Sequence, residues 1–133
     1  MIEYRDTHAL SPAALGALFC SVGWASGRYP EKLSAAMANF ETVYTAWDGE
    51  LLVGLVCALD DGMMTAYAHF LLVRPEYQGR GIGGQLMTRL LAHYRSYLRI
   101  VLAGVNEKVP FYEHFGFRAS DDSRVMFLTE LEN

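Results

Sequence analysis

Between Val73 and Gly84 the chain reads VRPEYQGRGIGG, and this stretch decides which fold we expect. Pro75 ends the strand predicted before it, and the helical spacing of apolar residues begins at Ile82. Closely spaced glycines before a helix let backbone N–H groups approach a ligand without hindrance from Cβ atoms. Because a helix N-terminus carries partial positive charge, phosphate is the ligand that such a loop favours. A tight turn followed by a glycine-capped helix is the competing interpretation.

Three kinds of phosphate-binding loop compete for this stretch. Gly79-x-Gly81-x-x-Gly84 formally matches the dinucleotide pattern, but that pattern opens a larger sheet and needs an acidic residue about 20 positions later. The strand predicted in that region ends at Ala103 without an acid, and only 49 residues follow Gly84. The Gly-Lys-Ser/Thr of a Walker loop is absent from the sequence. The remaining possibility is a loop that binds the pyrophosphate of another cofactor.

The sequence on both sides of the loop predicts a mixed sheet covered by helices. Three strands joined by short turns form an antiparallel meander, and a strand–helix–strand unit spanning the loop adds a parallel pair. We therefore expect a single domain over residues 1–133 with an α+β fold. Predicted helices begin at Pro12, Pro30, Ile82 and Glu107; predicted strands cover Ile2–Tyr4, Thr42–Trp47, Leu51–Leu59, Met64–Val73, Leu98–Ala103 and Val125–Leu128.

The glycine stretch resembles the acetyl-coenzyme A signature of the GNAT N-acetyltransferase superfamily. The signature's core, Gln/Arg-x-x-Gly-x-Gly/Ala, is met by Gln78, Gly81 and Gly83. Farther along, residues 111–117 read FYEHFGF, which is similar to the family's Tyr-x-x-x-Gly-Phe segment. The resemblance covers about residues 42–128, and residues 22–33 are faintly similar to plant-type arylalkylamine acetyltransferases. It implies the GNAT fold, in which the two parallel strands splay apart.

The resemblance also implies how acetyl-coenzyme A would bind. Backbone N–H groups of the loop would hold its pyrophosphate, and the last residues of strand 64–73 would pair with its pantetheine arm. A bulge near His69–Leu72 would help to open the splay. Arg74 and Arg80 carry positive charge near the loop, although a purely solvated role fits them equally well. The expected cofactor-binding residues are Leu71, Leu72, Val73, Gln78, Gly79, Arg80, Gly81, Ile82, Gly83 and Gly84.

The implied reaction is direct attack of an amine on the thioester in a ternary complex, without a covalent enzyme intermediate. Tyr112 is the candidate acid for the leaving thiolate, and an aromatic core residue is its structural alternative. His69 is the candidate base, at a position where family members often have Glu; Tyr67 is a weaker candidate. Trp24, Arg28 and Tyr29 lie between the first two predicted helices, where the acceptor amine would bind.

Composition narrows the remaining possibilities. The formal net charge of −4 argues against nucleic-acid binding, and no apolar run is long enough to span a membrane. Cys20 and Cys57 lack metal-ligand spacing and are expected to be buried thiols in a reducing compartment, which favours the cytoplasm and no metal. The family resemblance implies a small-molecule or peptide amine as the acceptor, and a homodimer stays open. A non-catalytic acyl-coenzyme A-binding module and a transferase of longer acyl chains are the alternatives.

Overall fold

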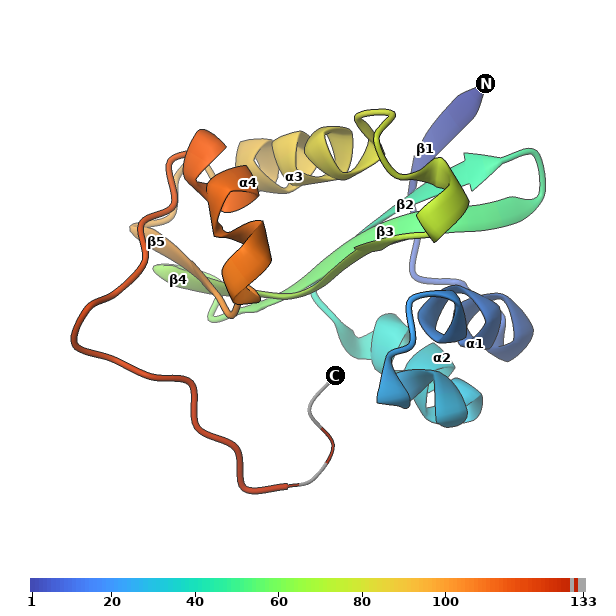
Figure 1. Cartoon of the computed structure of the whole chain (residues 1–133), viewed down its shortest axis with the longest axis horizontal. Coiled ribbons are helices and arrows are strands. Elements are labelled where there is room, and N and C mark those ends of the chain that lie inside the picture. The colour runs from blue at the N-terminus through green and yellow to red at the C-terminus, as the bar shows by residue number, and fades with distance from the viewer. Residues whose placement is uncertain (130, 132–133) are drawn as a thin grey trace.

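The computed structural model of the chain describes residues 1–129 and residue 131 (Figure 1). The α-helices and strands follow one another in the order that the sequence predicts up to residue 114. The elements are β1 (Ile2–Asp6), α1 (Pro12–Ser21), the 3₁₀ helix η1 (Ala25–Arg28), α2 (Pro30–Asn39), β2 (Thr42–Asp48), β3 (Leu51–Asp60), β4 (Thr65–Val73), the 3₁₀ helix η2 (Pro75–Tyr77), α3 (Ile82–His93), β5 (Arg99–Leu102), the 3₁₀ helix η3 (Asn106–Lys108) and α4 (Val109–His114).

The strands form a five-stranded sheet in the order β1-β2-β3-β4-β5. Neighbouring strands from β1 to β4 are antiparallel, whereas β4 and β5 are parallel because α3 carries the chain back between them. The predicted α+β fold with a mixed sheet is therefore confirmed. Figure 1 shows α1 and α2 on one face of the sheet and α3 on the other.

Each face of the sheet has its own apolar core. The first core joins α1 and α2 to β3 and β4, with Phe19, Met37 and Leu55 among its buried residues. The second core packs the apolar stripe of α3 onto the opposite face, with Leu86 and Leu90 fully buried. Since β3 is buried on both sides, it is the central strand on which both layers rest.

Polar contacts fix the ends of the helices against this sheet. Ser11 caps α1 by accepting a hydrogen bond from the Ala14 backbone N–H at 3.1 Å, as the Ser-Pro pair predicts. At the end of α3 the buried Tyr94 hydroxyl donates to Asp60 at 2.7 Å and accepts from Thr42 at 2.7 Å. These bonds connect the C-terminal end of α3 to the start of β2 and the end of β3.

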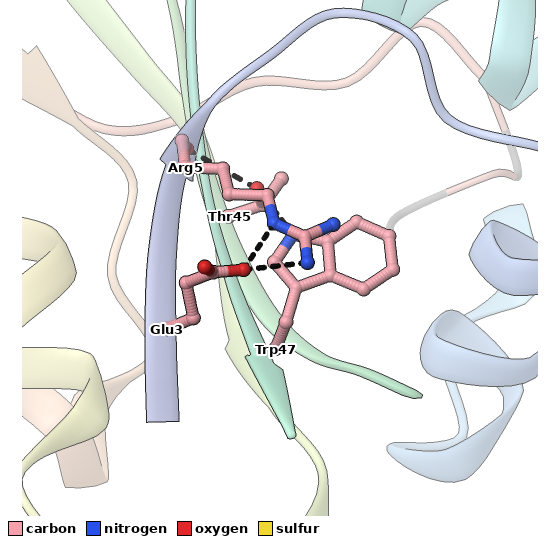
Figure 2. Close-up of polar contacts among 4 residues, drawn as sticks. All are labelled: Glu3, Arg5, Thr45 and Trp47. Atoms are coloured by element: carbon pink, nitrogen blue, oxygen red, sulfur yellow. Dashed lines mark hydrogen bonds and ion pairs between the residues drawn. The ribbon is translucent and has the colours of Figure 1, made fainter. Parts of the chain in front are cut away.

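The outer strand β1 is held to β2 by contacts that Figure 2 shows together. The guanidinium of Arg5 lies 4.5 Å from the centre of the Trp47 ring and forms an ion pair with Glu3. The Thr45 hydroxyl donates to the Arg5 carbonyl at 3.1 Å and accepts from the Trp47 indole N–H at 2.8 Å. Such pairs stabilise an edge strand through its side chains as well as its backbone.

Two sequence predictions are wrong, and both concern surface segments. Val125–Leu128 form no strand, because the chain leaves α4 and runs away from the sheet, so no neighbouring strand is present to pair with them (Figure 1). Cys20 is exposed: it follows the core residue Phe19 in the last turn of α1, and its sulfur lies beside Gly27 of η1 and not in the core beneath the helix. Cys57 is buried as predicted, and burial raises the pKa of its thiol to about 12.

The hairpin between β2 and β3 closes with a tight turn. Asp48 pairs with Leu51, so the two-residue loop is Gly49-Glu50. Gly49 has φ +61°, the left-handed conformation that favours glycine. Among the described residues no helix is long and apolar enough to cross a membrane, and no cluster of three potential metal ligands occurs.

Candidate active site

The parallel strands β4 and β5 pair along only part of their length. Their register runs from Thr65 opposite Arg99 to Ala68 opposite Leu102, and there β5 ends. The chain of β4 continues to Val73 with β3 on one side only. The edge of β4 from residue 69 to residue 73 is therefore open toward the side where β5 would have continued, and the expected splay is confirmed.

A β-bulge at His69 lies at the point where the splay begins. Phe70 pairs with Cys57 and Ala68 pairs with Ala58, so His69 is an extra residue without a partner on β3. The extra residue reverses the alternation of side chains, and Phe70 therefore packs in the α1–α2 core whereas Ala68 packs beneath α3. The predicted bulge is confirmed, and it places His69 and Phe70 together, with ring centres 4.0 Å apart.

The His69 imidazole lies among aromatic rings with one side exposed. It stacks on Phe40 with ring centres 5.9 Å apart, and its Nδ1 atom is 3.2 Å from the Tyr67 hydroxyl. Partial burial among these rings lowers the pKa of His69 below its ordinary value, because desolvation disfavours the charged form. His69 is therefore neutral at pH 7 and able to accept a proton.

Two clefts meet at His69, with volumes of about 450 and 630 Å³. Both are lined by Ser26, His69, Phe70 and Leu131, and the lining of each is rich in aromatic side chains. Trp24 lies in the larger cleft and Tyr29 in the smaller one. Lys32 contributes the fixed charge of the smaller cleft, and no Asp or Glu lines either cleft among the described residues.

Arg28 is the third residue that the sequence analysis placed near the acceptor amine, and unlike Trp24 and Tyr29 it lies outside the two clefts. It is exposed at the end of η1 and is not among the residues that line these two clefts. A role for Arg28 in acceptor binding stays a prediction. Phe40 and Phe70, by contrast, line the clefts although the sequence analysis did not select them as site residues. Their spacing in the sequence is that of ordinary core residues; the bulge is the signal for Phe70, and no local signal marks Phe40, which ends α2.

The glycine loop has the backbone conformation that an anion site needs. Gly79 and Gly81 have φ values of +79° and +81°, so both positions favour glycine for conformational reasons. The first hydrogen bond within α3 runs from the Gln85 N–H to the Gly81 carbonyl at 3.0 Å. The earlier amides, from Ile82 to Gly84, precede the helical ladder and point out of the N-terminal end of α3. They are the groups that could hold a pyrophosphate.

Gln78 and Arg74 anchor the loop to the sheet, whereas Arg80 contacts residues of the loop itself. The Gln78 side-chain amide donates to the Val73 carbonyl at 2.9 Å, which holds the loop against the end of β4. Arg74 donates to the Leu52 carbonyl at 2.9 Å, so at least part of its role is structural. The Arg80 guanidinium lies 4.8 Å from the centre of the Tyr77 ring and donates to the Glu76 carbonyl at 3.2 Å. Of the two arginines, Arg80 is exposed at the surface of the loop, whereas Arg74 is half-buried.

Two further glycines in the first turn of α3 are explained by contact with α4. A Cβ atom on Gly83 would lie 3.7 Å from the Phe111 ring, and one on Gly84 would lie 3.7 Å from Phe115. A larger side chain at either position would push against these rings. The small residues therefore let α4 approach the N-terminal end of α3, next to the proposed pyrophosphate site.

Tyr112 lies on α4, half-buried against the end of β5. A Cβ atom on Gly104 would come within 2.9 Å of the Tyr112 ring, so this glycine makes room for the tyrosine. The ring packs edge-on against Phe111 and Phe117, with centres 5.2 and 6.0 Å away. Desolvation raises the pKa of Tyr112, and the phenol therefore stays protonated at neutral pH. Gly104 also lines the larger cleft, and its signal in the sequence is a glycine directly after a strand.

Comparisons with known proteins agree with this geometry. The sequence profile described as an acetyltransferase (GNAT) domain matches residues 39–119. A serotonin N-acetyltransferase 2 from rice (Oryza sativa subsp. japonica) is 30% identical over 125 residues, covering 90% of this chain and 62% of that protein. The chain spans about half to three-fifths of the length of the curated relatives it matches.

Solved structures show the same fold. A GNAT family acetyltransferase from Streptococcus pneumoniae superposes with a TM-score of 0.83 at 27% identity, covering 98% of this chain and 99% of that one. An acetyltransferase from Clostridium acetobutylicum, solved with acetyl-coenzyme A, shares the fold at a TM-score of 0.68 and 16% identity, covering 96% and 97% of the two chains. With the splayed sheet, the glycine loop and the family profile in agreement, the chain belongs to the GNAT acetyltransferase family.

Proposed function

We propose that this protein transfers an acetyl group from acetyl-coenzyme A to a primary amine with an aromatic or apolar body. The observation that carries the proposal is the position of His69. It is a neutral imidazole on a bulge, at the junction of two aromatic clefts and at the start of the open edge of β4. A group that can accept a proton thus borders both the acceptor clefts and the strand edge that would take the pantetheine arm.

The residues of the chain divide the binding of acetyl-coenzyme A between three elements. The N-terminal amides of α3 and the loop from Gln78 to Gly84 are suited to the pyrophosphate, because they carry unpaired donors and partial positive charge. The open edge of β4 at Leu71–Val73 offers backbone groups to the pantetheine arm. The bound co-substrate supplies the acetyl group as a thioester.

Two side chains would move the protons of the reaction. The amine enters as an ammonium ion and must lose a proton before its nitrogen can attack, and His69 accepts that proton directly or through water. In the tautomer in which Nδ1–H donates to the Tyr67 hydroxyl, Nε2 has the lone pair that takes the proton. When the carbon–sulfur bond breaks, the Tyr112 hydroxyl protonates the departing thiolate. The raised pKa of Tyr112 keeps that proton available throughout the neutral range.

The lining of the clefts supports the acceptor class. Aromatic rings from Trp24, Tyr29, Phe40 and Phe70 would pack against a flat apolar body. A polyamine or a basic peptide would need carboxylates for its additional positive charges, and none lines these clefts among the described residues. The name of the rice relative, a serotonin N-acetyltransferase, supports the same class of acceptor. That the protein acts in the cytoplasm stays a prediction.

The experiment compares turnover of an arylethylamine with that of spermidine, following release of the free thiol of coenzyme A. We expect the arylethylamine to be the better substrate by kcat/KM. The Tyr112→Phe variant keeps the ring and its packing, so its melting temperature and its affinity for acetyl-coenzyme A should match the wild type. Its kcat should fall by about 10- to 10³-fold, the range for loss of a positioned acid.

Three results would each contradict a different part of the proposed function. Tight binding of acetyl-coenzyme A with no turnover of any amine would indicate a non-catalytic binding module. Preference for spermidine would refute the aromatic acceptor while leaving acetyl transfer intact. A Tyr112→Phe variant with normal kcat would make Tyr112 a packing residue, and the thiolate would then take its proton from water.

A further inference from the structure

The smaller cleft carries a fixed positive charge on its lining. Lys32 lines this cleft, and no other Lys, Arg, Asp or Glu does so among the described residues. The Lys32 Nζ atom lies 5.8 Å from the centre of the Tyr29 ring, and Tyr29 lines the same cleft. The ammonium group is therefore held over an aromatic ring at the rim of the cleft by a cation–π contact.

The charge of Lys32 is not neutralised by an ion pair within residues 1–129 and 131. Its neighbour Glu31 is exposed and does not line either cleft, and Arg28, four residues earlier, adds a second exposed positive charge. Glu130 lies outside the described residues, so its effect is a matter for substitution. A cleft whose charged groups have one sign attracts ligands of the opposite charge.

Helix α2 separates this charge from the proposed base. Lys32, Ala36 and Phe40 follow one another at four-residue spacing, and all three line the cleft. From residue 32 to residue 40 the axis of a helix advances by roughly 12 Å. Because the His69 ring stacks on Phe40, the imidazole lies at the Phe40 end of the cleft and the ammonium of Lys32 lies toward the other end.

We propose that Lys32 is an anion subsite, and that the preferred acceptor carries a carboxylate at the end of its aromatic body remote from the amine. The inference rests on the proposed function and narrows its substrate class. With the amine at His69, the ring would lie along the aromatic lining and the carboxylate would reach Lys32. An α-amino acid does not fit, because its carboxylate adjoins its amine. A second ammonium group at the remote end would be repelled by Lys32.

The test uses three phenethylamines that differ only in their para substituent: a carboxylate, a carboxamide or an aminomethyl group. In the wild type we expect kcat/KM to be higher for the carboxylate than for the carboxamide by about two- to fivefold, since ion pairs at exposed positions are weak. The aminomethyl compound should be the poorest acceptor. The difference should lie in KM and not in kcat, because Lys32 is remote from the reacting nitrogen, and it should shrink as salt is added.

Substitutions at Lys32 assign the preference to its charge. Lys32→Met keeps the length of the side chain and should make the carboxylate and the carboxamide equal. Lys32→Glu should reverse the order and favour the aminomethyl compound. Lys108→Met is the matched control, because Lys108 is the other lysine of the chain and is exposed in η3 outside both clefts. This variant should keep the wild-type order.

Equal kcat/KM for the carboxylate and the carboxamide in the wild type would overturn the anion subsite while leaving acetyl transfer intact. A carboxylate preference that persists in Lys32→Met would exclude Lys32 as its source. A preference found only in Glu130→Gln would also overturn the proposal, since an acid of the chain would then occupy Lys32. If no amine is turned over, the proposed function fails, and calorimetry with coenzyme A bound still tests the subsite: the carboxylate should bind more tightly than the carboxamide.

Discussion

At the scale of single residues, His69 owes its position to one extra residue in β4. Without the bulge, strict alternation would place either His69 or Phe70 on the α1–α2 face, but not both. With it, both rings and Tyr67 line the larger cleft. The family resemblance predicts a proton-accepting group at this position, where relatives often have Glu and this chain has His69, and the sequence predicts a bulge only approximately. Which neighbours the imidazole acquires depends on register, and no local pattern specifies that.

His69→Ala tests the proposed base. The pKa of His69 is lowered by desolvation, so kcat/KM of the free enzyme should fall as the pH drops through a value below the ordinary histidine range. In the variant, kcat/KM should no longer fall at low pH in this way, and kcat should be lower by about 10²-fold or more. Initial rates across pH 5 to 9 measure both effects. His93→Ala, at the end of α3 on the other face of the sheet, should keep the fall at low pH; an unchanged profile in His69→Ala would assign proton removal to water or another group.

At the scale of elements, the glycine loop combines conformational need with ligand access. Gly81 has φ +81° and no atom within 4 Å of a built Cβ, so its replacement strains the backbone without a steric clash. Gly62, in the β3–β4 turn, has φ +78° and is equally open. The two glycines thus have the same conformational requirement, and only Gly81 adjoins the amides proposed to bind phosphate.

The same substitution at Gly81 and at Gly62 gives a prediction that includes its own control. Gly81→Ala and Gly62→Ala should each lower the free energy of unfolding by about 1–2 kcal/mol, the cost of a left-handed residue with a Cβ. Only Gly81→Ala should also weaken binding of acetyl-coenzyme A, by roughly tenfold, since 1.4 kcal/mol of displaced contacts corresponds to that factor. Denaturant titration and calorimetry measure the two quantities. Equal affinities in both variants would remove the loop from the binding site.

The elements also show where sequence reasoning ends. The hairpins, the loop and the helix starts are predictable because Gly, Pro and Asp act through local backbone preferences, as at Ser11-Pro12 and Gly81. Val125–Leu128 has the composition of a strand but forms none in the structure. Whether a segment pairs depends on tertiary structure, which composition does not specify. Exposure of Cys20 likewise depends on which side of α1 meets the sheet.

At the scale of the whole molecule, the proposed binding site draws on the sheet and on two helices, α3 and α4. The open edge of β4 belongs to the sheet, the phosphate-binding amides belong to α3, and Tyr112 approaches from α4. None of these elements holds its position in the unfolded chain. Binding of acetyl-coenzyme A should therefore stabilise the folded state as a unit and raise its melting temperature by mass action.

Mass action sets the size of this stabilisation. At a concentration 100 times the Kd, a ligand that binds only the folded state adds about 2.7 kcal/mol, which for a chain of this length corresponds to roughly 10 °C in Tm. Pantetheine at the same concentration lacks the pyrophosphate and should shift Tm far less, because the amides of α3 gain no anion. Scanning calorimetry over a series of ligand concentrations gives both curves. If pantetheine matched acetyl-coenzyme A across the series, β4 alone would hold the ligand, and the N-terminal end of α3 would have no part in binding.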